Sequence, residues 1–138
     1  MPALDRYHTQ VRNALIKDGW TITDDPLKLK VDARNLYIDF GAERLLAAER
    51  GTEKIAVEIK LFRGPSPIAD LEQAIGQYGL YEDVLQLPEP GRVLYLAIPE
   101  AAFAAIFSER IGQIALKNRI HYTFTFAPEA EEIIQWNP

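Results

Sequence analysis

The sequence predicts an α/β domain in which helices cover a mixed β-sheet. Three observations lead to this fold class. Apolar residues at helical spacing open the chain, over residues 4–18. Two strands follow in a hairpin over residues 36–62, and the apolar run 93–98 is typical of a strand buried on both faces. Strands that alternate with helical segments in this way form layered α/β domains.

The length and composition indicate a single folded domain. The chain has 138 residues, so we expect one domain over residues 1–138. Hydrophobic residues make up 48% and charged residues 25%, as in ordinary globular proteins. The absence of cysteine excludes disulfides, cysteine-ligated zinc and a thiol nucleophile. With two histidines, a metal site would rest mainly on carboxylates, which favour magnesium or manganese.

Charge and hydropathy bound the compartment and the partners. The N-terminus carries no signal pattern and no apolar run has membrane-spanning length, so we expect a cytoplasmic protein without a membrane partner. The net charge of −5 argues against a protein that coats nucleic acid, because phosphate binding needs clustered lysine and arginine. A local basic groove, or a nuclease with a carboxylate-rich site, is compatible with this charge.

The other elements follow from periodicity and turn residues. Gly19 is a natural end for the first helix, and a helix is predicted over residues 68–86, with Ser66 near its N-cap. Further strands are predicted at residues 20–23, 27–30, 122–126 and 133–136, and further helices at 99–107 and 111–117. The apolar strand at 122–126 is expected at a sheet edge, where pairing with a second copy would give a homodimer.

The hairpin carries an unusual pair of charges. A turn at Gly51 is expected to join its two strands. Glu58 and Lys60 lie two residues apart in an apolar run, so they share one face of the second strand. Burying such charges is costly unless they are matched or serve a function.

The expected register adds a second carboxylate to this pair. Antiparallel pairing about Gly51 would bring Glu43 near Lys60, so that Glu43, Glu58 and Lys60 converge. Asp39 lies further along the first strand, on the same face as Glu43. Spacing to the turn therefore favours Glu43, with Asp39 as the second candidate.

Two carboxylates and one lysine suit the hydrolysis of a phosphodiester. Glu43 and Glu58, with Asp39 as a further ligand, would hold Mg²⁺ or Mn²⁺, which activates water and neutralises developing charge. Lys60 would position that water or stabilise the transition state. The alternative is a salt-bridge ladder on a solvated sheet face, and the residues alone leave both interpretations open.

A polar stripe on the helix at 68–86 adds a third wall to the expected cleft. Gln73, Gln77 and Tyr81 follow one another at intervals of about one helical turn. Gln77 is the candidate site residue among them, because an amide that faces the sheet needs hydrogen-bond partners.

The order of these residues resembles that of the PD-(D/E)xK nuclease superfamily. An acidic residue on one strand (Glu43 or Asp39) precedes Glu58-Ile59-Lys60 on the next, and Gln77-Tyr78-Gly79-Leu80-Tyr81 follows on a helix. Over nearly its whole length the chain is also similar to the XisH family. The segments that carry this likeness are His8 and residues 13–20, 39–49, 55–60 and 70–78.

The resemblance implies both a fold and a role. The fold would be a three-layer restriction-endonuclease-like domain with a central mixed sheet flanked by helices. The role would be that of a DNA-acting excision controlling factor, which assists a site-specific recombinase and an XisI-like partner in removing the fdxN element from a cyanobacterial chromosome. The protein would act as a metal-dependent DNA endonuclease, or as an inactive accessory protein that binds DNA, recombinase or XisI.

Overall fold

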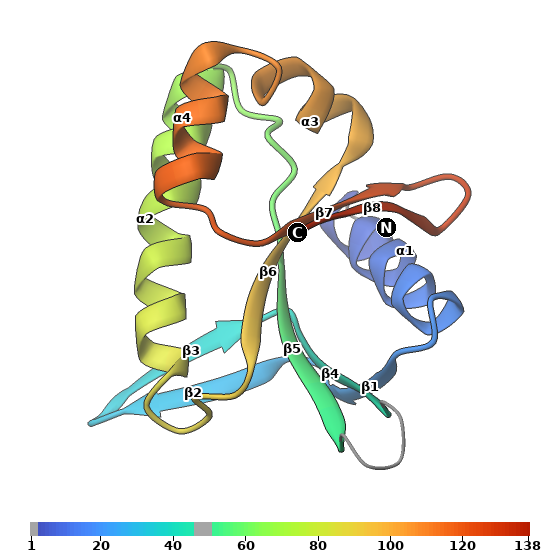
Figure 1. Cartoon of the computed structure of the whole chain (residues 1–138), viewed down its shortest axis with the longest axis vertical. Coiled ribbons are helices and arrows are strands. Elements are labelled where there is room, and N and C mark those ends of the chain that lie inside the picture. The colour runs from blue at the N-terminus through green and yellow to red at the C-terminus, as the bar shows by residue number, and fades with distance from the viewer. Residues whose placement is uncertain (1–2, 46–50) are drawn as a thin grey trace.

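The computed structural model describes residues 3–45 and 51–138, which form helical layers around a sheet (Figure 1). The helices of these residues are α1 (Ala3–Lys17), α2 (Pro67–Leu85), α3 (Glu100–Ile106) and α4 (Arg110–Asn118). The strands are β1 (Thr21–Asp24), β2 (Leu27–Val31), β3 (Arg34–Ile38), β4 (Phe40–Leu45), β5 (Thr52–Ile59), β6 (Val93–Pro99), β7 (Thr123–Ala127) and β8 (Glu132–Asn137). Within this described part, no helix has the length and apolar character to cross a membrane.

The central sheet is six-stranded and mixed. Its order is β1-β4-β5-β6-β7-β8. The strands β5, β6 and β7 are parallel, whereas β1 and β4, β4 and β5, and β7 and β8 pair antiparallel. β2 and β3 form a separate two-stranded sheet. This arrangement confirms the expected three-layer restriction-endonuclease-like fold, with a central mixed sheet flanked by helices.

Helices cover the sheet on both faces, α1 on one side and α2 with α4 on the other (Figure 1). Val11 and Leu15 of α1 belong to the same buried cluster as Val57 of β5. Leu71 of α2 belongs to a second cluster, together with Ala56 of β5. Because side chains alternate along a strand, Glu58 faces the α2 side, as Ala56 does.

The strand predicted to be buried on both faces is confirmed. β6 lies between β5 and β7, with Leu96 in the α2 cluster and Ala97 in the α1 cluster. The edge position expected for residues 122–126 is wrong, since β8 pairs along the open side of β7, with Trp136 opposite Phe124. The edge-strand argument for a homodimer therefore does not hold.

The first strand of the predicted hairpin is divided in two. Its N-terminal part, β3, pairs with β2, and its C-terminal part, β4, joins the central sheet. The division falls at Asp39, between Ile38 in the α2 cluster and Phe40 in the α1 cluster. The last residues assigned to that strand, 46–50, lie outside the described residues.

The predicted register of the hairpin is wrong. Phe40 pairs with Val57, and Glu43 pairs with Lys54 rather than with Lys60. Phe40 and Val57 belong to one apolar cluster, and matching apolar faces fix a register more strongly than the position of one turn residue. Leu45 pairs with Thr52, so the register of the described strands is centred before Gly51.

The contact between α3 and α4 generates a stability prediction. A Cβ atom at Gly112 would collide with the backbone of Ile106 and Phe107. We expect Gly112→Ala to lower the free energy of unfolding by about 1–3 kcal/mol, measured in urea. Gly76→Ala on α2 is the matched control, since nothing lies within 4 Å of its Cβ position. That change should stabilise the protein by up to about 1 kcal/mol, and equal effects of the two changes would contradict the tight α3–α4 contact.

Candidate functional site

A cleft of about 570 Å³ opens between α1, α2 and the C-terminal end of β5. Its lining residues are Tyr7, His8, Asp39, Glu58, Ile59, Lys60, Gln73 and Gln77. The structure thus brings together four of the residues selected from the sequence, namely Asp39, Glu58, Lys60 and Gln77.

Reciprocal hydrogen bonds hold the two carboxylates at the base of this cleft. The backbone N–H of Asp39 donates to Oε1 of Glu58 at 3.1 Å. In return, the backbone N–H of Ile59 donates to Oδ2 of Asp39 at 2.8 Å. The crossing from β3 to β4 is therefore fastened to the end of β5, and the two carboxylates lie side by side.

The acid–base behaviour of Glu58 reflects this confinement. The pKa of Glu58 is raised from 4.5 to about 8, mainly by burial and then by the negative charge of Asp39, whereas the positive charge of Lys60 acts against the rise. Glu58 therefore retains its proton at neutral pH when no cation is bound. Strong perturbation by burial and by a like charge is typical of functional sites.

Amide side chains of α2 line the opposite wall. The Nζ atom of Lys60 donates to Oε1 of Gln73 at 2.7 Å. One turn further along α2, Nε2 of Gln77 donates to the hydroxyl of Tyr81 at 3.2 Å. Because a neutral amide accepts from Lys60, its ammonium keeps its charge available to an anion in the cleft.

The α1 wall is connected to the segment that precedes β2. Nε2 of His8 lies 2.6 Å from Oδ1 of Asp25, and Nε of Arg12 lies 3.1 Å from Oδ2 of the same carboxylate. The His8 ring also packs on Phe40, with centroids 4.3 Å apart. His8 thus lines the cleft while its imidazole contacts Asp25.

Glu43 lies outside the cleft. Its partner in the sheet is Lys54, four residues before Glu58 on β5, which corresponds to about 13 Å along the strand. The convergence expected for Glu43, Glu58 and Lys60 is therefore wrong, and Asp39 takes the position next to Glu58. No local signal in the sequence indicates that Asp39 rather than Glu43 lies next to Glu58, since the register depends on apolar contacts with α1.

Sequence reasoning also left out parts of the cleft wall. Gln73 was recognised in the polar stripe but not selected, although it is the residue that contacts Lys60. Tyr7 falls within the apolar pattern of residues 4–18, and the guanidinium of Arg63 lies over its ring at 5.6 Å. Its position in the cleft follows from the packing of α1, which no motif indicates.

The oxygen donors of the cleft suit a divalent cation of the magnesium type. Magnesium in proteins is commonly bound through one or two carboxylates and retains several waters. A cation beside Asp39 and Glu58 would remove the repulsion that raises the pKa of Glu58. Among residues 3–45 and 51–138, no group of three or more histidine or carboxylate side chains is gathered for metal binding. The set therefore consists of two carboxylates, Asp39 and Glu58.

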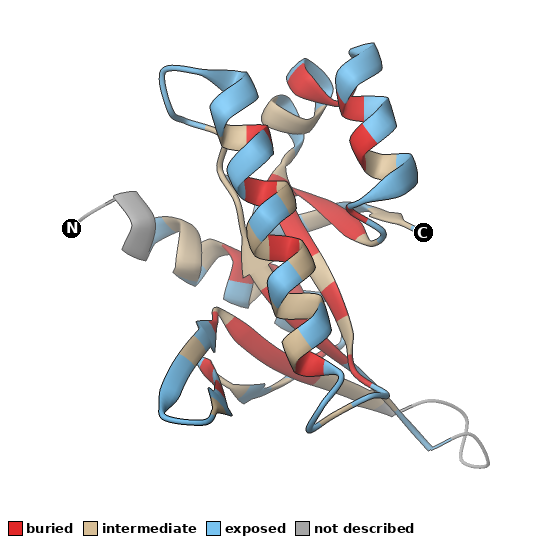
Figure 2. Cartoon of the chain, turned by 90° about the vertical axis from the view of Figure 1, so that its left-hand side faces the viewer, coloured by how far each residue is buried: buried red, intermediate tan, exposed pale blue. Residues whose placement is uncertain are grey.

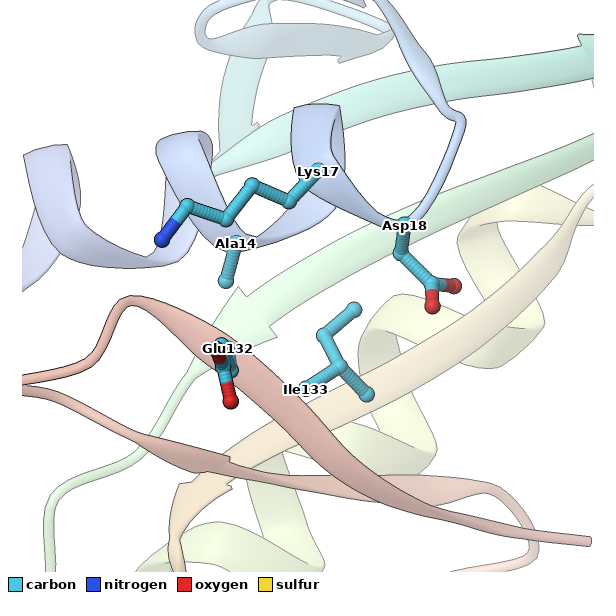
Figure 3. Close-up of a pocket in the computed structure, with 5 residues that line it drawn as sticks. All are labelled: Ala14, Lys17, Asp18, Glu132 and Ile133. Atoms are coloured by element: carbon cyan, nitrogen blue, oxygen red, sulfur yellow. The ribbon is translucent and has the colours of Figure 1, made fainter.

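A second pocket, of about 250 Å³, lies between α1 and β8 (Figure 3). Figure 3 shows Ala14, Lys17, Asp18, Glu132 and Ile133 around it. Lys17 donates to the backbone oxygen of Ala130 at 2.8 Å. The neighbouring Asn13 donates to Glu131 at 2.7 Å. These contacts connect α1 to the β7–β8 turn, so we assign this region a structural role.

Comparisons with known proteins agree with the architecture. The family model described as XisH protein matches residues 1–134. The crystal structure of an XisH family protein from Nostoc punctiforme is similar, with a TM-score of 0.84 and 38% identity over 97% of this chain and 100% of that chain. An fdxN element excision controlling factor protein from Anabaena variabilis has a TM-score of 0.84 and 39% identity over 97% of this chain and 99% of that chain. A comparison with curated proteins found no match.

The raised pKa of Glu58 makes the stability of the protein depend on pH. The folded protein keeps this proton up to about pH 8 whereas the unfolded chain loses it near 4.5, so the free energy of unfolding falls as the pH rises between these values. Glu58→Gln keeps an oxygen that can accept from Asp39 and removes the charge. We expect this variant to be more stable than wild type at pH 8 by roughly 1–3 kcal/mol, allowing for partial solvent exposure.

Urea unfolding with EDTA, at about pH 5 and about pH 8, measures this difference. At the lower pH the two proteins should differ by less than about 1 kcal/mol. Glu43→Gln is the control, because it removes a carboxylate from the same hairpin outside the cleft. A Glu58→Gln variant no more stable than wild type at the higher pH would show that the carboxylate is not confined as described.

Proposed function

The chain belongs to the XisH family, and from that premise we propose that it controls the excision of a chromosomal element by acting on DNA at the cleft between Asp39 and Glu58. The name of the Anabaena variabilis relative, an fdxN element excision controlling factor protein, supports the excision role. The site proposal rests on one observation. Two carboxylates, each of which accepts from a backbone N–H of the other's segment, line the cleft with Lys60, whose ammonium is held by a neutral amide.

Five residues of the cleft have a part in the proposed reaction. Asp39 and Glu58 would hold Mg²⁺ or Mn²⁺, which when bound lowers the pKa of water and neutralises charge on a phosphodiester. The Oε1 atom of Gln73 accepts from the ammonium of Lys60 at 2.7 Å and holds it in the same cleft as the two carboxylates. Lys60 would donate to the attacking water or to a phosphate oxygen that gains charge. Gln77, on the same wall of the cleft, would hydrogen-bond to the DNA strand.

Binding of the cation, rather than of the negatively charged substrate, would require Glu58 to lose its proton. Its raised pKa means that the apo cleft carries less negative charge at neutral pH than two free carboxylates would. This lowers the repulsion of a DNA phosphate before a cation is bound. Proton loss from Glu58 is thereby linked to cation binding.

We further propose that the protein acts together with a site-specific recombinase and an XisI-like partner protein. Excision of a chromosomal segment requires strand exchange at two ends, for which the cleft described here supplies no recombinase chemistry. In this role, the protein would prepare or constrain the DNA on which a recombinase acts.

A second candidate function is DNA binding without cleavage. The observation that favours it is the small carboxylate set, because Asp39 and Glu58 are the two carboxylates among the described residues that line the cleft, while Glu43 pairs with Lys54. In this case the cleft would hold DNA for the recombinase, and the same fold would act as an accessory factor. The two candidates differ in whether the phosphodiester bond is broken.

Cation binding is the first test of the cleft. Isothermal titration with Mn²⁺ should detect binding that weakens at least about tenfold in Asp39→Asn and in Glu58→Gln. Binding should release protons, and its apparent affinity should rise between about pH 6 and about pH 8, because Glu58 must ionise. Glu43→Gln should bind Mn²⁺ as wild type does. Binding that survives loss of both Asp39 and Glu58 carboxylates would contradict the assignment.

Cleavage is the second test and separates the two candidate functions. Supercoiled, linear and branched DNA should be nicked or cut in the presence of Mn²⁺. Lys60→Ala should lower the rate about 10²–10³-fold, because it removes a donor that acts in the transition state. Glu43→Gln should keep the wild-type rate. Intact DNA of every form, together with binding that weakens as salt increases, would rule out the nuclease and favour the accessory factor.

A further inference from the structure

The β2–β3 hairpin presents one polar face to solvent, on the side turned away from the protein core. Exposed and buried residues alternate along most of β2, and in β3 the exposed residues Asn35 and Tyr37 stand on either side of half-buried Leu36. Figure 2 shows exposed residues along this hairpin. Lys28 pairs with Tyr37 and Lys30 pairs with Asn35, and all four of these residues are exposed. Cross-strand partners lie on the same face, so the outer face of the hairpin consists of two lysines, a tyrosine and an asparagine.

The inner face of the hairpin anchors it to the domain. Leu27, Leu29 and Ile38 are buried in the cluster that includes Leu71 of α2. The backbone of the ribbon is therefore held in place by apolar packing, and exchange of the outer residues leaves that packing untouched.

The charge of this hairpin is opposite to that of the whole chain. Residues 27–38 include Lys28, Lys30 and Arg34 and a single carboxylate, Asp32, whereas the chain carries a net charge of −5. Within the part of the chain that the structure describes, none of the ion pairs involves Lys28, Lys30 or Arg34. Three cations are thus available to an external anion on a short exposed ribbon.

Both ends of the hairpin connect to the walls of the cleft. Asp25, just before β2, contacts His8 at 2.6 Å, and His8 lines the cleft. Asp39, just after β3, accepts from the backbone N–H of Ile59 at 2.8 Å. A polyanion bound at the base of the hairpin would therefore lie near the cleft.

We propose that the outer face of the β2–β3 hairpin binds the phosphate backbone of duplex DNA and guides the DNA toward the Asp39–Glu58 cleft. The proposal rests on the proposed action on DNA and names the surface that recognises it. Lysine, tyrosine and asparagine side chains all donate hydrogen bonds to phosphate oxygens in protein–DNA interfaces. Contacts to phosphate carry little sequence information, so this ribbon supplies affinity and orientation rather than choice of sequence.

The geometry favours DNA over an acidic protein partner for one reason. Both ends of the cationic hairpin adjoin a cleft that holds Asp39, Glu58 and Lys60, which are suited to a phosphodiester and not to a peptide carboxylate. An acidic protein would gain nothing from that continuity. Binding of poly-L-glutamate is measured beside binding of DNA, so that an acidic protein partner and duplex DNA give different results.

The experiment measures the affinity of the full chain for a labelled duplex of about 20 base pairs by fluorescence anisotropy, in EDTA, at salt concentrations between about 50 and 200 mM. The variant is the double change Lys28→Ala, Lys30→Ala. Loss of two phosphate contacts should weaken binding roughly 10–100-fold near 0.1 M salt and reduce the slope of log K against log salt by about 2. The control is Arg110→Ala, Lys117→Ala on α4, which removes two exposed cations from another element and should leave both quantities unchanged.

The outcomes separate this proposal from the function on which it rests. A wild-type chain that binds DNA, with the hairpin variant binding equally well, would overturn the hairpin proposal and leave the proposed function standing. A wild-type chain that binds no duplex even at the lowest salt would overturn both. A hairpin variant that loses affinity for poly-L-glutamate but keeps its affinity for DNA would overturn the proposal in favour of an acidic protein partner.

Discussion

The reciprocal hydrogen bonds between Asp39 and the end of β5 hold the candidate site of this protein together. At Asp39 the chain leaves the small β2–β3 sheet and enters the central sheet. The backbone N–H of this residue donates to the Glu58 side chain, and its carboxylate accepts from the backbone N–H of Ile59. These bonds fasten the crossing from β3 to β4 at the edge of the cleft.

The same bonds create an electrostatic cost. They hold two carboxylates together in a partly buried place, where Glu58 keeps its proton at neutral pH. Lys60 reduces this cost only in part, since its ammonium is directed to Gln73 rather than to a carboxylate. A buried carboxylate beside a like charge is typical of functional sites, whereas a structural ion pair would be neutralised internally.

The sequence was sufficient to predict most helices and strands, and to place Glu58 and Lys60 together at the second strand of the hairpin. Glu58 and Lys60 share a face because a strand has a period of two, and this depends on no distant contact. The choice between Asp39 and Glu43 failed because it depended on the hairpin register. That register is fixed by Phe40 and Val57 packing against α1, a contact that no local pattern encodes. The same reason explains Gln73, whose role depends on how α2 lies over the sheet.

The β2–β3 hairpin has a consequence for how this fold can diversify. β1 and β4 are neighbours in the central sheet, so the hairpin is a branch inserted between two strands that already pair. Its buried face is shared with the domain, but its outer face is shared with nothing in the described chain except solvent. Mutations on that outer face can accumulate without disturbing the core or the carboxylates. The charge of this exposed surface can therefore evolve separately from the two carboxylates of the cleft.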